Sequence, residues 1–338
     1  MMPRTDSPIP RRASLKALAL ACLAPLAAAL PGAATADDWP ARPVTLVAGF
    51  GTGGGLDSMT RAMNGYLAEE LGVPVSVVNR PGAGTMVAAT YVLNQRDDGY
   101  TLFSSTFSPY LNTAVLTGQA DFTIEDFAYL NFQWFDFDLV ATSADSRFSS
   151  LAELVSEIRD APGKVRAAVV QGSAGHLITK LMLERAGIPQ ENLNLVTYNS
   201  GGDARTAVAG GQVDFFVIGA EGSEGVREMI RPLAIVDSRR HGEWDAPPLN
   251  EALAPLGIEM PLIPGAIRGF AVSAAARTES PEAWDRLVAA FQNVLSRKDV
   301  QEDLAARNIG SVWIGPERAA EMMKDSYQTF ATYGYLLE

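Results

Sequence analysis

Apolar runs and glycine-rich turns alternate along most of the chain, and this pattern predicts repeated strand-then-helix units. The first unit is a strand over residues 44–48 followed by a helix over residues 56–71, where apolar positions recur at helical spacing. Further strands are predicted at 75–78 and 101–104. Since such units align successive strands and cover them with helices, we expect an α/β fold with mostly parallel sheets.

The same pattern begins again after residues 139–142, so a second α/β half is predicted. Its strands are expected at 165–171, 193–198, 213–218 and 233–236, and Ser150 with Glu153 indicates a capping box at a helix start. A last strand at 270–273 precedes three helices at 281–295, 300–307 and 316–333 that have no sheet of their own. We expect these helices to return to the first half, which gives one lobe of residues 37–140 plus 270–338 and another of residues 141–269. Two crossings between the lobes are typical of a hinge.

The first 36 residues have the pattern of a cleaved export signal. Arg11-Arg12 and Lys16 precede an apolar, alanine-rich stretch that ends before Ala34-Thr35-Ala36, a small-x-small cleavage site. The paired arginines favour the twin-arginine route, with an ordinary secretory signal as the alternative. Lipid attachment at Cys22 is a further alternative. Export to the periplasm is therefore predicted.

Composition narrows the classes of function. The formal charge of the 338-residue chain is −12, and removal of residues 1–36, which carry +3, takes it to −15. Such an acidic protein is not expected to bind nucleic acid, because phosphate backbones require clustered Lys and Arg. The signal contains the only cysteine, and the two histidines are not paired at metal-ligand spacing, so no disulfide and no metal site are expected.

Glycine-rich turns after predicted strands are the strongest candidates for a binding site. The turn over residues 50–56 opens a helix, and comparable turns occur at 82–85, 172–175 and 200–202. The first amides of a helix have no internal partner and lie at the positive end of its dipole, so a carboxylate or phosphate can bind to the backbone alone. On two facing lobes these turns would surround a small anion with neutral amides.

Other interpretations of these residues stay open. The spacing Gly49-x-Gly51-x-x-Gly54 also fits a dinucleotide-binding turn, and Arg80 in place of a ribose-binding acid would suit an NADP-dependent oxidoreductase. A turn that serves only close packing is a third possibility. His176 is interpreted as a hydrogen-bonding or packing residue at a helix start in preference to a catalyst, since Ser173 lacks the spacing of a nucleophile elbow.

Two further features of the sequence, one acidic residue and one cluster, each allow two interpretations. Asp57 fits either a ligand contact or a first-turn acid favoured by the helix dipole. Phe132, Trp134, Phe135 and Phe137 with Asp136 and Asp138 form an aromatic and acidic cluster near the predicted crossing. Packing in the core or between lobes is the favoured role of this cluster, and lining of a ligand site is the alternative.

Ordered motifs give the chain a resemblance to a known family. They include Phe50-x-x-Gly53-Gly54-x-x-Asp57-x-x-x-Arg61, Val78-Asn79-Arg80-Pro81-Gly82-Ala83-Gly84 and Gly172-Ser173-x-Gly175-His176. In order and spacing the sequence resembles the extracytoplasmic solute receptors of tripartite tricarboxylate transporters, also called Bug receptors. It departs from the family pattern at Gly49 and Gly51, where prolines are common, and at Asn199-Ser200, where a lysine-containing pair is common.

The resemblance implies a two-lobed periplasmic-binding-protein fold, similar to type II, that closes on a small organic carboxylate without a cofactor or a catalytic step. It also implies membrane permease subunits as partners, and we expect a monomer. Neighbouring genes, not this chain, would distinguish uptake from sensing. Motifs and resemblance together give the candidate ligand-binding residues: Phe50, Thr52, Gly53, Gly54, Gly55, Asp57, Gly84, Ser104, Ser105, Thr106, Gly172, Ser173, Ala174, Gly175, His176, Tyr198, Asn199, Gly201 and Asp214.

Overall fold

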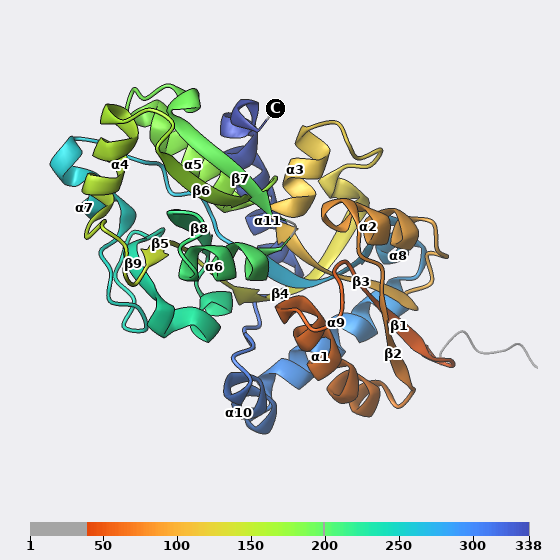
Figure 1. The fold of residues 1–338 in the computed structure, drawn as a ribbon. Helices are drawn as coiled ribbons and strands as arrows, with labels where there is room; N and C mark the ends of the chain where they lie inside the picture. The colour runs from red at the N-terminus through yellow and green to blue at the C-terminus, as the bar shows by residue number, and fades with distance from the viewer. Residues whose placement is uncertain (1–38, 199, 338) are drawn as a thin grey trace, which may run out of the picture. The chain divides into compact units, whose positions relative to one another are not determined.

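Two five-stranded sheets organise the chain. The computed structural model describes residues 39–198 and 200–337 (Figure 1). One sheet has the order β2-β1-β3-β10-β4 and the other has the order β7-β6-β8-β5-β9. The predicted export signal, its cleavage site near Ala36, Cys22 and Asn199 lie outside the described residues.

The strands and helices follow the alternation expected from the sequence. The first sheet contains β1 (Val44–Ala48), β2 (Val75–Asn79), β3 (Thr101–Ser108), β4 (Phe127–Phe135) and β10 (Ile267–Ser273). The second contains β5 (Asp138–Ser143), β6 (Val165–Val170), β7 (Leu193–Tyr198), β8 (Phe215–Gly219) and β9 (Ile230–Ile235). The α-helices are α1 (Gly55–Leu71), α2 (Met86–Leu93), α3 (Tyr110–Leu116), α4 (Leu151–Asp160), α5 (Ala174–Arg185), α6 (Gly201–Ala209), α7 (Leu249–Leu253), α8 (Ala274–Glu279), α9 (Pro281–Ser296), α10 (Lys298–Ala306) and α11 (Gly315–Tyr333). Six short 3-10 helices complete the described part: η1 (Ala83–Thr85), η2 (Ile124–Asp126), η3 (Gln190–Asn192), η4 (Glu221–Met229), η5 (Ala254–Leu256) and η6 (Gly334–Leu336).

Each sheet combines parallel and antiparallel strands. In the first sheet β1 pairs in parallel with β2 and β3, whereas β10 is antiparallel to β3 and β4. In the second sheet β6 is parallel to β7 and β8, whereas β5 is antiparallel to β8 and β9. The antiparallel strands β5 and β10 are the two that the chain enters on leaving the other sheet. No crossover helix within the same sheet precedes them, so the rule that aligns successive strands does not apply to them.

Separate apolar cores lie against the sheets. The helices α1 and α9 contact one another beside the first sheet, and α5 packs on β8 of the second (Figure 1). In α5 the residues Leu177, Ile178, Leu181, Met182 and Leu183 are all fully buried. Such a helix is held by the surrounding core on several sides, so its N-terminus is fixed relative to the sheet.

The two segments that connect the sheets run in direct contact. The chain passes from β4 to β5 through Asp136 and Phe137, and the backbone N–H of Asp136 donates to the carbonyl of Ala266 on the returning segment at 3.0 Å. A Cβ atom on Gly265 would lie 2.1 Å from the Asp136 carbonyl oxygen. The close approach of these connections therefore depends on glycine at this position.

Helix α11 makes a further link that the sequence did not predict. Ala319 and Met323 of α11 pack in a core beside the first sheet, while Phe330 of α11 and Leu336 of the following η6 join the core of the second sheet. The last helices were expected to return to the first half. A 19-residue helix is about 28 Å long, which is sufficient to reach both cores. No helix within residues 39–198 and 200–337 is long and apolar enough to cross a membrane.

Candidate ligand-binding cavity

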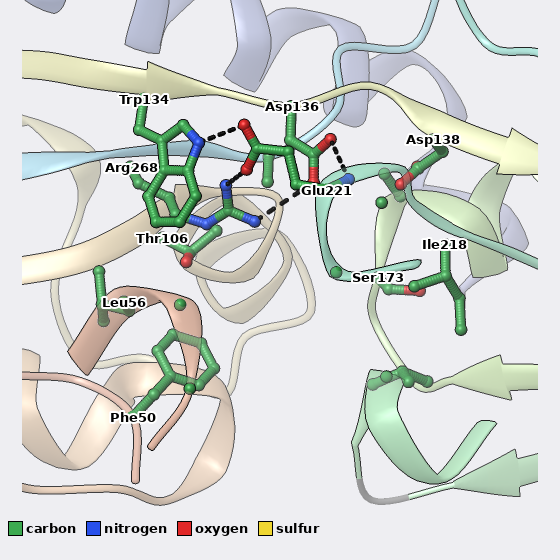
Figure 2. Close-up of a pocket in the computed structure, with 18 of the residues that line it drawn as sticks. Phe50, Leu56, Thr106, Trp134, Asp136, Asp138, Ser173, Ile218, Glu221 and Arg268 are labelled. Carbon is green, nitrogen blue, oxygen red and sulfur yellow. Dashed lines mark hydrogen bonds and ion pairs between the residues drawn. The ribbon is translucent and has the colours of Figure 1, made fainter. Parts of the chain in front are cut away.

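A cavity of about 440 Å³ is lined by elements from both sheets. Figure 2 shows Phe50 and Leu56 on one side of it, with Ser173 and Ile218 on the other. A volume of this size accommodates a small metabolite.

The N-terminus of α1 forms one wall. Gly54 is the N-cap of this helix and makes no side-chain capping hydrogen bond, so no side chain occupies the amides that follow it. Gly54, Gly55 and Leu56 all line the cavity. Asp57 stabilises the turn before α1, because its carboxylate accepts a hydrogen bond from the N–H of Gly53 at 3.0 Å and also binds the side chains of Arg61 and Asn79.

The N-terminus of α5 forms the opposite wall. Ser173 is its N-cap and accepts a hydrogen bond from the N–H of His176 at 3.1 Å, while Ser173, Ala174 and Gly175 line the cavity. The helix begins unusually close to the sheet, since a Cβ atom built on Gly175 would lie 1.7 Å from the carbonyl oxygen of Val217 in β8. Glycine thus allows the first turn of α5 to approach the carboxyl end of β8.

A third helix start adds a cation. Gly201 of α6 lines the cavity, and so does Arg205 one helical turn later. The guanidinium of Arg205 donates to the carbonyl of Gly219 at 2.8 Å and to the hydroxyl of Ser223 at 2.9 Å. Burial lowers the pKa of Arg205 from its ordinary value, although the group remains a cation at any physiological pH.

A charged network lies between the two sheets. Arg268 of β10 donates to Glu221 of η4 at 3.3 Å and to Asp136 at 3.4 Å, and its guanidinium lies 4.4 Å from the ring centre of Trp134 (Figure 2). The indole N–H of Trp134 donates to the other oxygen of Glu221. Arg268 therefore connects acidic groups from two parts of the fold.

Asp138 differs from these two acids. It is only 6% exposed at the start of β5, and its Oδ2 atom has no hydrogen-bond partner within the described residues. Burial, together with the nearby Asp136, raises the pKa of Asp138 from 3.8 to about 7. Burial likewise raises the pKa of Glu221 to about 7, with Asp136 as the second cause.

The raised pKa of Asp138 predicts how stability depends on pH. A carboxyl that holds its proton more tightly when folded carries no penalty below its unfolded pKa of about 3.8, and the penalty is complete above its folded pKa of about 7. We expect Asp138→Asn to be more stable than the wild type by on the order of 3 kcal/mol near pH 8, with the gap closing toward pH 4. Urea unfolding of both proteins across this range measures the gap. A gap that stays constant with pH contradicts the prediction.

Eight of the candidate residues from the sequence line the cavity: Phe50, Gly54, Gly55, Thr106, Ser173, Ala174, Gly175 and Gly201. Asn199 lies outside the described residues. The structure places the others beside or away from the cavity: Thr52, Gly53, Asp57, Gly84, Ser104, Ser105, Gly172, His176, Tyr198 and Asp214.

Several of these other residues have structural partners of their own. The hydroxyls of Ser104 and Ser105 are fully buried and pair with Thr60 and Thr85. The Nδ1 atom of His176 accepts from the N–H of Gly172 at 3.4 Å, and burial followed by Lys180 lowers the pKa of His176 to about 4. This neutral ring supports the turn before α5 and is not brought to the cavity.

Asp214 lies at the opposite end of β8 from the cavity. It precedes Phe215, whereas the cavity-lining Ile218 and Gly219 end the strand. Its carboxylate accepts from the backbone N–H of Arg166 at 2.8 Å. The structure therefore does not bring Asp214 together with the helix N-termini.

Sequence reasoning did not identify the arginines of the cavity. Arg205 carried a usable signal, because it stands four residues after Gly201 and must share a helix face with it. No comparable signal marks Arg268 in the sequence, because the direction of its side chain depends on the register of β10. Trp134, Asp136 and Asp138 belonged to a cluster for which packing was the favoured role, and all three line the cavity.

The features expected of a dinucleotide site are arranged differently. Asn79 at the end of β2 donates to Asp57 and to the carbonyl of Phe50, and the guanidinium of Arg80 lies 3.6 Å from the ring centre of Tyr91. Neither Asn79 nor Arg80 lines the cavity. Within the described parts of the chain no group of three or more acidic, histidine or cysteine side chains is arranged to hold a metal ion.

Several solved structures share this fold. The structure of R. palustris Rpa4515 with adipate has a TM-score of 0.71 and 24% identity, covering 89% of this chain and 98% of that one. MatC (Rpa3494) from Rhodopseudomonas palustris with bound malate also has a TM-score of 0.71, at 23% identity, covering 89% of this chain and all of that one. The periplasmic binding protein BugD has a TM-score of 0.69 at 22% identity, covering 87% of this chain and 97% of its own. These likenesses, all below 25% identity, show a shared fold.

Sequence comparison identifies the family. The model of the tripartite tricarboxylate transporter family receptor matches residues 59–329. Protein BugT of Bordetella pertussis is 31% identical over 307 residues, which cover 88% of this chain and 90% of BugT. The chain belongs to the tripartite tricarboxylate transporter receptor family, whose members are periplasmic solute-binding receptors and not enzymes. The family resemblance seen in the sequence is thereby confirmed.

Proposed function

We propose that this protein captures a small organic carboxylate in the cavity and delivers it to the membrane permease subunits of a tripartite tricarboxylate transporter. One observation carries the proposal: the N-terminus of α1, which packs on the first sheet, and the N-terminus of α5, which packs on the second sheet, line the same cavity. Each terminus offers backbone N–H groups and a positive dipole end, so a carboxylate between them gains interactions from both sides.

Binding between two sheets also supplies a signal. A ligand that contacts α1 and α5 together favours the arrangement in which both helix starts are close to it, because its affinity for that arrangement is higher. Motion about the adjacent connections at Asp136 and Ala266 would bring the walls together. A permease that recognises the closed arrangement would then distinguish loaded receptors from empty ones.

The relatives support the carboxylate as ligand class. Structures with the same fold hold adipate in one case and malate in another. For this chain we further propose export by the segment before residue 37, cleavage near Ala36, location in the periplasm and a monomeric state. Sequencing the N-terminus of protein recovered from the periplasm tests the cleavage site.

A thermal-shift screen of the exported protein tests the proposed function. Dicarboxylates, tricarboxylates, aromatic acids and amino acids are added one at a time, because a ligand that binds only the folded state raises the unfolding temperature. We expect at least one carboxylate to raise it, and calorimetry then gives the affinity. If no member of any of these classes binds, the proposed function is wrong.

Substitution of Gly54 tests the helix N-terminus directly. The backbone angles of Gly54, φ −86 and ψ 169, suit any residue, and the atom nearest to an added Cβ is 4.0 Å away. We expect Gly54→Val to fold and to lose at least about tenfold in carboxylate affinity, because its side chain would stand beside the open amides. The matched control is Gly51→Val, at an exposed position where nothing lies within 4 Å and which does not line the cavity. Equal affinities of the two variants, measured by calorimetry, would count against binding at α1.

A further inference from the structure

The cavity contains one buried carboxyl group that the protein leaves without a partner. Asp138 lines the cavity with only 6% of its surface exposed, and its Oδ2 atom makes no hydrogen bond to the described residues. In Figure 2 its side chain lies apart from the bonded network of Asp136, Glu221 and Arg268. A buried acceptor without a partner is costly, so such an atom points to a donor supplied from elsewhere.

The neighbouring charged groups are already engaged. Asp136 accepts from the N–H of Glu221 at 3.3 Å and from Arg268. Glu221 accepts from Arg268 and from Trp134. Arg205 donates to a carbonyl and a hydroxyl of the second sheet's own elements. None of these charged groups pairs with the Oδ2 atom of Asp138, which leaves that atom open to a group that enters the cavity.

We propose that Asp138 binds a protonated nitrogen of the ligand, so that the carboxylate captured here is a zwitterion such as an amino acid. This inference rests on the proposed function: the carboxylate end would meet the N-termini of α1 and α5, and the ammonium would meet Asp138. All three elements line the same cavity.

The balance of charge in the cavity favours this class over a dicarboxylate. This part of the cavity lining contains three carboxyl groups but only two guanidiniums. The carboxyl groups are those of Asp136, Asp138 and Glu221, and the guanidiniums are those of Arg205 and Arg268. Arg307 also lines the cavity, but it is paired with Asp303 at 2.9 Å. A second carboxylate on the ligand would add negative charge next to an unpaired acid, whereas an ammonium compensates that acid in a site of low dielectric.

Titration of Asp138 would couple binding to pH. The groups that face it are Asp136 from the β4–β5 connection, Arg205 from α6, Arg268 from β10 and Tyr110 from α3. Burial holds the pKa of Asp138 at about 7, so the acid is partly protonated near neutral pH. A bound ammonium stabilises the ionised form and therefore binds better as the pH rises through this value.

Matched pairs of compounds test the inference on the wild-type protein. L-glutamate is compared with glutarate, L-aspartate with succinate, and L-leucine with 4-methylpentanoate, each by calorimetry at about pH 8. Within each pair only the ammonium differs. In at least one pair we expect the amino acid to bind about tenfold more tightly or better, and to weaken as the pH falls below about 7. If in every pair that binds the acid without nitrogen binds as tightly as the amino acid or more tightly, the inference is wrong.

The substitution Asp138→Asn removes the charge with little change of shape. We expect the amino acid of the responsive pair to lose at least about tenfold in affinity and its partner without nitrogen to gain affinity. Asp145→Asn, at an exposed turn beyond the other end of β5, is the matched control and should keep the preference for the amino acid. An unchanged preference in Asp138→Asn overturns the inference.

The outcomes separate the two proposals. If dicarboxylates or aromatic acids bind and amino acids do not, the receptor function stands and the role of Asp138 is wrong. If neither amino acids nor any other carboxylate binds, the proposed function fails, and the inference fails with it.

Discussion

Gly175→Ala is expected to destabilise the protein by about 3 kcal/mol or more, because the added methyl group has no space. Its Cβ atom would lie 1.7 Å from the carbonyl oxygen and 2.6 Å from the carbonyl carbon of Val217, and both are backbone atoms of the central strand β8. The start of α5 would have to move away from the sheet. The expected result is a thermal unfolding midpoint lowered by roughly 5 °C or more, together with weaker ligand binding at the displaced helix start.

Gly202→Ala provides the control for this substitution. Gly202 is also near the start of a helix beside the second sheet, but the atom nearest to its added Cβ is the hydroxyl of Ser200 at 3.7 Å. Alanine there should be neutral or stabilising by up to about 1 kcal/mol, since it is the better helix former. If Gly175→Ala unfolds at the same temperature as Gly202→Ala, the contact between α5 and β8 is not as close as the structure indicates.

Local pattern was sufficient to predict most elements of the fold. The predicted helix at 56–71 is α1 (Gly55–Leu71), and Ser150 caps α4 as its spacing indicated, with its side chain accepting from the N–H of Glu153. Helical periodicity and capping depend on residues a few positions apart, so a single sequence carries them. Strand β4 (Phe127–Phe135) was missed, because it is buried on both faces and shows no alternation.

Long-range placement was harder to predict. The turns at Gly54 and Ser173 were predicted as candidate binding elements, because a helix N-terminus can be recognised locally, and both line the cavity. In contrast, Arg268 and Glu221 come within 3.3 Å only after the chain has crossed between the sheets twice. Their pairing depends on the register of β10 and on the path of η4. Neither can be deduced from one sequence without knowledge of the packed structure.

Arg268 occupies a position where several parts of the fold depend on one cation. Its side chain is 16% exposed, and that of its partner Asp136 is 1% exposed. Glu221, the other partner, is 31% exposed and comes from η4 beside the second sheet, whereas Arg268 belongs to β10 of the first. Loss of the guanidinium would leave a buried carboxylate without compensation.

Arg268→Met is therefore expected to lower the free energy of unfolding by about 3–5 kcal/mol at neutral pH, although methionine fills a similar volume. The loss should be smaller near pH 5 than near pH 8, because burial raises the pKa of Glu221 to about 7, so that this partner of Arg268 is already neutral at pH 5. Urea unfolding at about pH 5 and pH 8 measures this difference. Adding Asp136→Asn to Arg268→Met should recover part of the stability at pH 8, since the double variant no longer buries the unpaired acid. If Arg268→Met is as stable as the wild type at pH 8, or if Asp136→Asn restores nothing, Asp136 does not depend on Arg268 for its charge compensation.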